Sequence, residues 1–97
     1  MFDKPSRKKD DALKKTYCKK YCIVCNKYGS EPHHLISVGA GGPDEDWNMV
    51  ALCRIHHHEI HNIGLFSFSK KYISFVAWLI AMSWSLNPQE NKWEHYE

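Results

Sequence analysis

The stretch Leu52-Cys53-Arg54-Ile55-His56-His57-His58-Glu59-Ile60-His61 concentrates metal-binding side chains more than any other part of the chain. Upstream lie Cys22-x2-Cys25 and the pair His33-His34, so six of the seven histidines fall between positions 33 and 61. These residues divide into a thiolate-rich group and a group of imidazoles alone. Thiolates favour closed structural zinc sites, whereas three imidazoles are typical of an open catalytic site. The sequence therefore predicts two separate metal sites.

The thiolate-rich group consists of two short knuckles, each with two ligands separated by two residues. This spacing suits the tetrahedral coordination of structural zinc. The predicted ligands are Cys22, Cys25, Cys53 and His56. Cys18 is the odd thiol and is interpreted as a packed or surface residue, with competition for the zinc site as the alternative. A chain of only 97 residues supports one small core and often needs such a metal staple.

The imidazole group depends on a helix predicted to start near Arg54. His57 and His61 are four residues apart, so both rings project from one face of that helix and can bind one ion. His33, on a neighbouring predicted strand, is the natural third ligand, and His34 then points to the other side of the strand. Such a site leaves an open position for water or phosphate, with a neutral imidazole nearby to remove a proton.

The N-terminal half combines a basic lead with strand signals. Residues 1–9 are expected to be flexible and residues 10–97 to form one domain. A helix capped by Asp10 or Asp11 is predicted next, with an apolar stripe of Leu13, Tyr17 and Tyr21. Strands are predicted at 33–38 and 49–52. The glycine-rich segment 38–43 between them is expected to be a loop, and no Lys-Ser/Thr helix follows to make it a nucleotide cradle.

The C-terminal part, residues 65–97, is predicted to hold one more helix and a tail. The helix that starts near Arg54 should stop at Gly64. A second helix should follow it and run from about Ser69 to Met82. Apolar residues wrap most of the second helix, which indicates burial in the chain's own core or, alternatively, a surface for a partner. The polar tail 87–97 contains two aromatic residues that can dock on the body, Trp93 and Tyr96, and His58 and His95 are interpreted as surface residues.

Charge is unevenly distributed along the chain. The formal net charge is only +2, yet residues 1–27 hold nine Lys/Arg against three Asp, while residues 28–97 hold four against eight acids. The basic half is the better candidate for facing phosphates. No signal peptide is expected at the charged N-terminus, and the apolar run 72–82 is too short to span a bilayer. A cytoplasmic protein with reduced thiols and no membrane association is therefore expected, in a host cell's cytoplasm if a phage encodes it.

These motifs together resemble the HNH, or ββα-metal, nuclease family. The resemblance covers about residues 17–64 and is carried by Pro32-His33-His34-Leu35, Gly39-Ala40-Gly41-Gly42, Asp46-Trp47-Asn48 and the run from Leu52 to His61. Small phage-encoded HNH proteins, including those related to recombination-enhancement nucleases, are similar. The resemblance implies an α+β fold: a small zinc-stabilised ββα-metal domain with flanking N- and C-terminal helices.

The resemblance also implies a role for each residue of the second site. His33, His57 and His61 would bind the catalytic ion. His34 would be the general base, and Asn48 would hold the loop by hydrogen bonds so that His34 is correctly aimed. The implied catalytic residues are thus His34, Asn48, His57 and His61, and the implied ion is divalent: zinc, nickel, manganese, cobalt or magnesium.

Two departures from the family pattern and one alternative assignment accompany this resemblance. Many members have a carboxylate at the position of His33, which leaves the metal's identity open, and many have a fourth cysteine at the position of His56. A second frame places His57 on zinc, with His58 and Asn62 at the catalytic ion. That frame is disfavoured because it loses both the Cys-x2-His knuckle and the all-histidine group.

The sequence therefore favours a metal-dependent endonuclease that hydrolyses DNA phosphodiester bonds and is encoded by a phage or mobile element. The main alternative is a catalytically inactive, zinc-stabilised DNA-binding or adaptor module, which has no use for His34 or Asn48. A protein-interaction domain that uses the Tyr72–Met82 face is a third possibility. The expected partners are DNA and other phage recombination or packaging proteins, and the chain is expected to be a monomer or weak homodimer.

Overall fold

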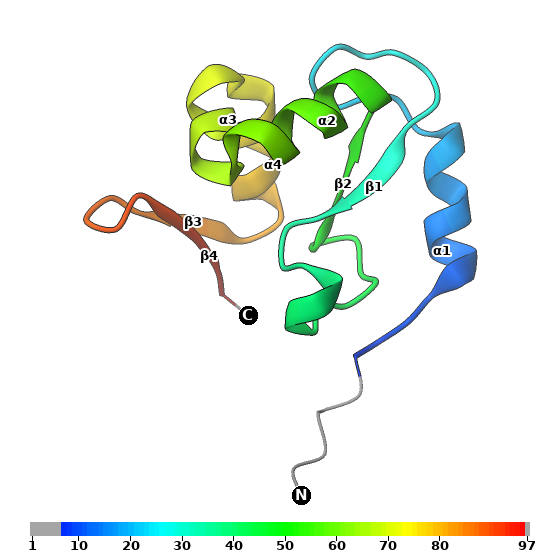
Figure 1. Ribbon diagram of the computed structural model, residues 1–97, viewed down its shortest axis with the longest axis horizontal. Helices are drawn as coiled ribbons and strands as arrows, with labels where there is room; N and C mark the ends of the chain where they lie inside the picture. The colour runs from blue at the N-terminus through cyan, green and yellow to red at the C-terminus, as the bar shows by residue number, and fades with distance from the viewer. Residues whose placement is uncertain (1–6, 97) are drawn as a thin grey trace, which may run out of the picture.

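The centre of the molecule is a β-hairpin followed directly by a helix. The computed structural model describes residues 7–96. Strand β1 (Glu31–His34) pairs antiparallel with β2 (Met49–Leu52), and only Cys53 separates β2 from helix α2 (Arg54–Ile63). Helix α1 and helix α2 lie on different sides of this hairpin (Figure 1). This arrangement, a ββα unit with flanking N- and C-terminal helices, confirms the predicted α+β class.

Strand β2 has the predicted bounds, but β1 lies earlier than the predicted strand at 33–38. Strand β1 ends at His34 because the side chain of Asn48 makes the hydrogen bonds with the Ile36 backbone that a partner strand would otherwise make. The Asn48 amide accepts a hydrogen bond from Ile36 N at 2.8 Å and donates one to Ile36 O at 3.1 Å. These bonds replace a strand ladder, and a 3-10 turn, η2 (Val38–Ala40), follows.

Helix α2 follows its prediction closely. It begins at Arg54 and is capped at its C-terminus by Gly64, whose φ of 86° is a conformation that favours glycine. The N–H of Gly64 donates to the carbonyl of Ile60 at 2.9 Å, and Ile60 is the buried residue of the helix. This single buried anchor fixes which side of α2 faces the core.

The N-terminal helix is shorter than predicted. Asp10 caps α1 (Asp11–Lys15) as expected, but the chain then tightens into a 3-10 helix, η1 (Thr16–Lys19). Of the predicted apolar stripe, Tyr17 is buried, whereas Tyr21 lies beyond the helix and is exposed. The spacing of the stripe therefore overestimated the length of the helix.

The basic lead, predicted as flexible over residues 1–9, makes specific contacts where it is described. Residues 1–6 lie outside the described part of the chain. Arg7 forms an ion pair with buried Asp44 at 2.6 Å, and the N–H of Asp44 donates to the carbonyl of Lys8 at 2.8 Å. These contacts connect Arg7 and Lys8 with a segment that is distant in sequence, and the flexibility of residues 1–9 stays a prediction.

The predicted helix at 69–82 was also wrong: two helices, α3 (Leu65–Lys71) and α4 (Ile73–Ala81), occupy this region. The break falls at Tyr72, whose φ of −125° and ψ of 108° are extended. The Tyr72 hydroxyl donates to Glu59 of α2 at 2.5 Å. The hydrogen bond that anchors Tyr72 on α2 therefore accompanies a break in an apolar run whose periodicity predicts one continuous helix.

Helix α4 is only partly buried. Phe75 and Leu79 are fully buried, whereas Ile73 is 87% exposed and Ile80 is 64% exposed. The core that α4 joins also draws on the loop before β1, on β2, α2 and α3, and on the C-terminal hairpin. Its buried residues are Cys22, Val50, Leu52, Cys53, Ile60, Phe68, Phe75, Leu79, Trp84 and Trp93. Among residues 7–96, no helix is long and apolar enough to cross a membrane.

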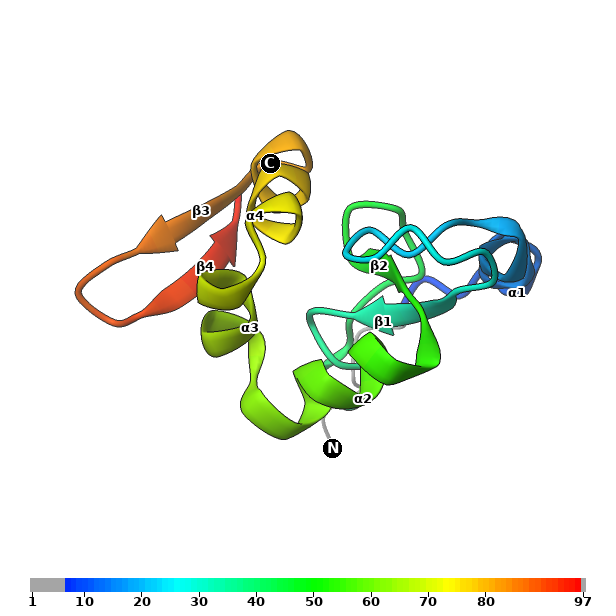
Figure 2. The same ribbon diagram turned by 90° about the horizontal axis from the view of Figure 1, so that it is seen from above.

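The C-terminal tail forms a hairpin that the sequence did not indicate. Strands β3 (Trp84–Asn87) and β4 (Lys92–His95) pair antiparallel and lie beside α3 and α4, on the side away from α1 (Figure 2). Trp93 docks as predicted: it is buried, and its Nε1 donates to a hydroxyl of α3 at 2.8 Å. Tyr96 remains exposed.

Candidate metal centres

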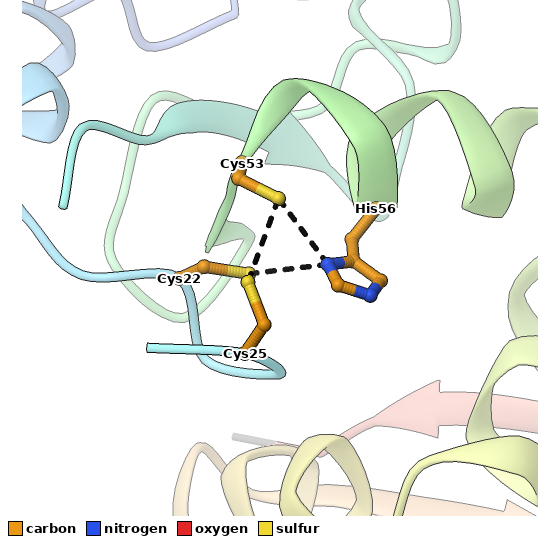
Figure 3. Close-up of side chains that lie close together, drawn as sticks. All are labelled: Cys22, Cys25, Cys53 and His56. Carbon is orange, nitrogen blue, oxygen red and sulfur yellow. Dashed lines mark hydrogen bonds between the residues drawn. The ribbon is translucent and has the colours of Figure 1, made fainter. Parts of the chain in front are cut away.

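Four side chains from two segments meet at the start of α2. Cys22 and Cys25 come from the loop before β1, Cys53 caps the start of α2, and His56 lies in the first turn of α2 (Figure 3). All four donor atoms lie within 4.8 Å of one another. The Sγ atoms of Cys25 and Cys53 are 3.7 Å apart, and His56 Nδ1 lies 3.2 Å from Cys53 Sγ. The structure thus brings together the predicted thiolate-rich group.

The dimensions and charges of this group fit zinc. Two sulfurs that each lie about 2.3 Å from a tetrahedral zinc are about 3.8 Å apart, close to the observed separation. Burial raises the pKa of Cys22, but backbone hydrogen bonds outweigh it and leave that pKa lowered. A backbone hydrogen bond lowers the pKa of Cys25, yet desolvation and the neighbouring thiols raise it overall. A central cation would relieve this crowding of thiolates.

Cys18 stands apart from this group, as interpreted from the sequence. It is exposed, and its Sγ donates to the carbonyl of Lys15 at 3.1 Å. Competition with Cys22 for the same site is therefore not supported by the positions of the side chains.

The imidazole group also forms. His33 of β1 lies across from His57 and His61 of α2, and all three offer ring nitrogens within 4.8 Å of one another. The Nε2 atoms of His57 and His61 are 3.2 Å apart. Two nitrogens that each lie about 2.0–2.1 Å from one tetrahedral ion are about 3.3 Å apart. The rings are therefore spaced to share an ion.

A carboxylate orients one of these rings. Nδ1 of His57 lies 2.9 Å from Glu31 Oε1, which leaves Nε2 of His57 to face His61. The hydrogen bond from His57 lowers the pKa of Glu31, so Glu31 is ionised and His57 donates through Nδ1. A carboxylate behind a metal-binding histidine fixes the tautomer and strengthens the ligand.

His33 is kept neutral by its surroundings. Burial, together with the charges that the neighbouring histidines would carry, lowers the pKa of His33 to about 3. An imidazole must be neutral to offer a nitrogen lone pair to a metal. The donor set therefore fits a divalent ion, and one that accepts imidazole, such as zinc, nickel or cobalt, better than one that prefers oxygen.

His34 lies beside this group. It lines the same cavity of about 260 Å³ as His33, His57 and His61. Nε2 of His34 is 2.8 Å from Oδ1 of Asp44, and the His34 side chain is mostly buried. His34 follows His33 along β1, and it is thus held by the carboxylate of Asp44 and not by the imidazole group.

Asn48 holds the loop that carries this carboxylate. It is fully buried, and its amide donates to the carbonyl of Pro43 at 3.1 Å in addition to its two bonds with Ile36. Gly42 makes this closure sterically feasible, because a Cβ at that position would lie 1.8 Å from the carbonyl of Ile36. Asn48 therefore positions the segment from Ile36 to Pro43 around the end of β1.

The remaining histidines behave differently from each other. His58 and Asn62 are both exposed on α2, and His57, which the alternative frame assigns to zinc, lies with His33 and His61 instead. His95, interpreted as a surface residue, is partly buried and stacks on Trp47 with ring centroids 3.9 Å apart.

Two carboxylates, Glu31 and Asp44, were not singled out from the sequence. Glu31 precedes the His33-His34 pair by two residues on the same strand, so alternation along the strand could have placed it on the face of His33. Asp44 carries no comparable signal, because it is one of three consecutive acids after the glycine-rich loop.

We expect the thiolate-rich group to hold one zinc on which folding depends. Cys53→Ser should give unfolded or insoluble protein, since a structural zinc contributes on the order of 10 kcal/mol of metal-linked folding free energy. The matched control is Cys18→Ser, which should keep both zinc and fold. Metal analysis with circular dichroism measures both properties. A well-folded, zinc-free Cys53→Ser protein would contradict the assignment.

Comparison with known proteins places these features in a family. A family model described as "Putative HNHc nuclease" matches residues 6–87. An "Uncharacterized 38.5 kDa protein in psbA intron 1" of Chlamydomonas moewusii is 52% identical over 33 residues, which cover 34% of this chain and 10% of that protein. The "Uncharacterized protein YdfU" of Escherichia coli (strain K12) is 39% identical over 54 residues, 53% of this chain and 15% of that protein.

The two curated relatives are thus much longer than the parts matched, and no solved structure matches the chain. The family match, by contrast, extends from the basic lead through the ββα unit into β3. It spans both groups of candidate ligands. The chain therefore belongs to this HNH nuclease family.

Proposed function

We propose that this protein is a metal-dependent endonuclease that hydrolyses phosphodiester bonds of DNA. The observation that carries the proposal is that one cavity is lined by three converging imidazoles and by a fourth histidine held separately by a carboxylate. Membership of an HNH nuclease family supports the same reaction class. A binding module has no need of such a fourth histidine.

In this proposal, three histidines of the chain would bind the metal and a fourth would accept a proton. His33, His57 and His61 would hold a divalent ion, which when bound supplies Lewis-acid stabilisation of charge on the phosphate and on the leaving 3′ oxygen. His34 would take a proton from the attacking water. Because its Nε2 lies against Asp44, Nδ1 is the nitrogen left for this step.

We propose that a nearby cation assists the transition state, and the candidates Arg54, Lys70 and Lys71 are not equally available. Lys71 forms an ion pair with Glu59, and Lys70 lies over the ring of Phe66. Arg54 is 89% exposed and reaches within 3.8 Å of Glu31, the carboxylate behind His57. Arg54 is therefore the best placed of the three to meet a phosphate at the imidazole group.

The biological setting follows from the same proposal. We infer an origin in a phage or mobile element, and the name of one relative, which places that protein in an intron, supports this inference. DNA would be the main partner, with other phage recombination or packaging proteins as further partners. The protein would act in the cytoplasm as a monomer or weak homodimer, with the exposed Ile73 and Ile80 as the candidate contact.

Two substitutions should abolish cleavage for different reasons. His34→Ala should lower the rate about 10²- to 10⁴-fold, the usual contribution of a general base, and keep fold, metal affinity and DNA binding. His57→Ala should lose the second ion and keep the structural zinc. Calorimetric metal titration beside a plasmid-nicking assay separates the two effects. His58→Ala, an exposed histidine on the same helix, is the matched control and should behave as wild type.

Two results of that experiment would change the proposal. If His34→Ala lost the second ion while His33→Ala kept it, the roles of the paired histidines would have to be exchanged. If neither His34→Ala nor His57→Ala altered cleavage, the nuclease proposal itself would fall.

The metal dependence of cleavage should reflect the imidazole donors. Manganese, nickel, cobalt or zinc should support cleavage at least as well as magnesium, because neutral imidazoles suit these ions better than a cation that prefers oxygen. Plasmid nicking in protein stripped of weakly bound metal, with each ion added separately, measures this preference. Activity in magnesium alone would indicate that an additional carboxylate completes the site.

A further inference from the structure

Asp44 is a fully buried carboxylate outside both groups of candidate ligands. Its Oδ1 accepts from Arg7 at 2.6 Å and faces Nε2 of His34 at 2.8 Å. Its Oδ2 accepts from the backbone N–H of Asp10 at 2.8 Å and lies 3.4 Å from Lys14 Nζ. Both oxygens are thus engaged, and only one of these four partners is a residue with a proposed part in the chemistry.

The carboxylate of Asp44 is ionised. Burial raises its pKa, but the hydrogen bonds from Arg7, from the Asp10 backbone and from His34, with the charge of Lys14, outweigh burial and leave the pKa well below its usual value. An ionised carboxylate has no proton to donate and only accepts hydrogen bonds. The proton in its bond with His34 therefore belongs to the histidine, on Nε2.

This constraint decides which nitrogen of His34 can react. A neutral imidazole carries one N–H and one lone pair, so a proton fixed on Nε2 leaves the lone pair on Nδ1. Without a partner on Nε2, the ring could adopt either tautomer and could rotate about its side-chain bonds. The Asp44 bond removes both freedoms in a side chain that lines the cavity.

We propose that Asp44 is a positioning residue that fixes the tautomer and direction of His34, so that Nδ1 faces the reacting water. This inference rests on the proposed nuclease function and adds a residue to it. A carboxylate behind a catalytic histidine has the same effect in hydrolases with an Asp-His pair, where it holds the tautomer and does not itself take the proton.

A purely structural role for Asp44 has a different signature. In that case the carboxylate would serve to tie the N-terminal segment to the loop through Arg7, which also donates to the carbonyl of Gly42 at 3.1 Å. Arg7→Gln removes the ion pair and leaves the Asp44–His34 bond in place. Asp46→Asn changes another carboxylate of the same loop. This carboxylate accepts a hydrogen bond from the hydroxyl of Tyr17 and is not bonded to a histidine. These two variants are matched controls.

The first test compares single-turnover DNA cleavage at saturating metal. Asp44→Asn should lower the rate by about 10²-fold or more, within the range of a general base, and should leave the affinity for the second ion unchanged. Arg7→Gln and Asp46→Asn should cleave nearly as fast as wild type. In a His34→Ala background, Asp44→Asn should cause no further loss, because its effect is exerted through His34.

The second test needs no variant that could fail to fold. The ¹⁵N chemical shifts of His34 in the wild-type protein, at a pH where the ring is neutral, should report the Nε2–H tautomer. An Nδ1–H tautomer would overturn the inference.

Two outcomes of the cleavage test would also overturn it. One is an Asp44→Asn protein that cleaves as fast as wild type, and the other is an Arg7→Gln protein that loses as much rate as Asp44→Asn. A wild-type protein that cleaves no DNA with any ion would overturn the proposed function instead, while the tautomer measurement still tests the Asp44–His34 contact.

Discussion

The rotation of helix α2 about its own axis is the constraint on which both candidate centres depend. Successive residues of an α-helix point about 100° apart, so His56 and His57 face different sides of α2. His56 joins the thiolate-rich group, while His57, one residue later, joins His33 and His61. Fixing the first turn of α2 through Cys53 and His56 therefore also sets where the second group lies. In this view the structural zinc would orient the helix that carries two ligands of the other ion.

A second constraint lies in the loop before β2, where consecutive side chains each hold a different part of the chain. Asp44 binds Arg7 and His34, Glu45 binds Lys8, and Asp46 binds Tyr17. Trp47 stacks on His95, and its carbonyl accepts from Trp84 of β3. Asn48 closes the loop on Ile36 and Pro43. The segment 44–48 thus connects the N-terminal segment, the end of β1 and the C-terminal hairpin.

Local spacing explains what the sequence made predictable. The Cys-x2-Cys and Cys-x2-His knuckles, the His-x3-His pair on α2 and the glycine at its end depend on residues a few positions apart, where helix and turn geometry leave little choice. Contacts over long sequence separations were not predictable. Asp44 forms an ion pair with Arg7, which is 37 residues away in sequence. The break between α3 and α4 falls at Tyr72, whose hydroxyl donates to Glu59 of α2. The β3–β4 hairpin likewise depends on Trp84 and Trp93 reaching the core.

The positions of the metals are the central expectation: one chain should hold two ions at two chemically different sites. Anomalous X-ray scattering measures this directly, on crystals of the zinc-loaded protein soaked in a nickel or manganese salt and recorded on both sides of each metal's absorption edge. We expect a zinc peak among Cys22, Cys25, Cys53 and His56, and a separate peak of the soaked metal among His33, His57 and His61. A single metal position in the soaked crystals, or a second peak beside His58 and Asn62, would contradict it.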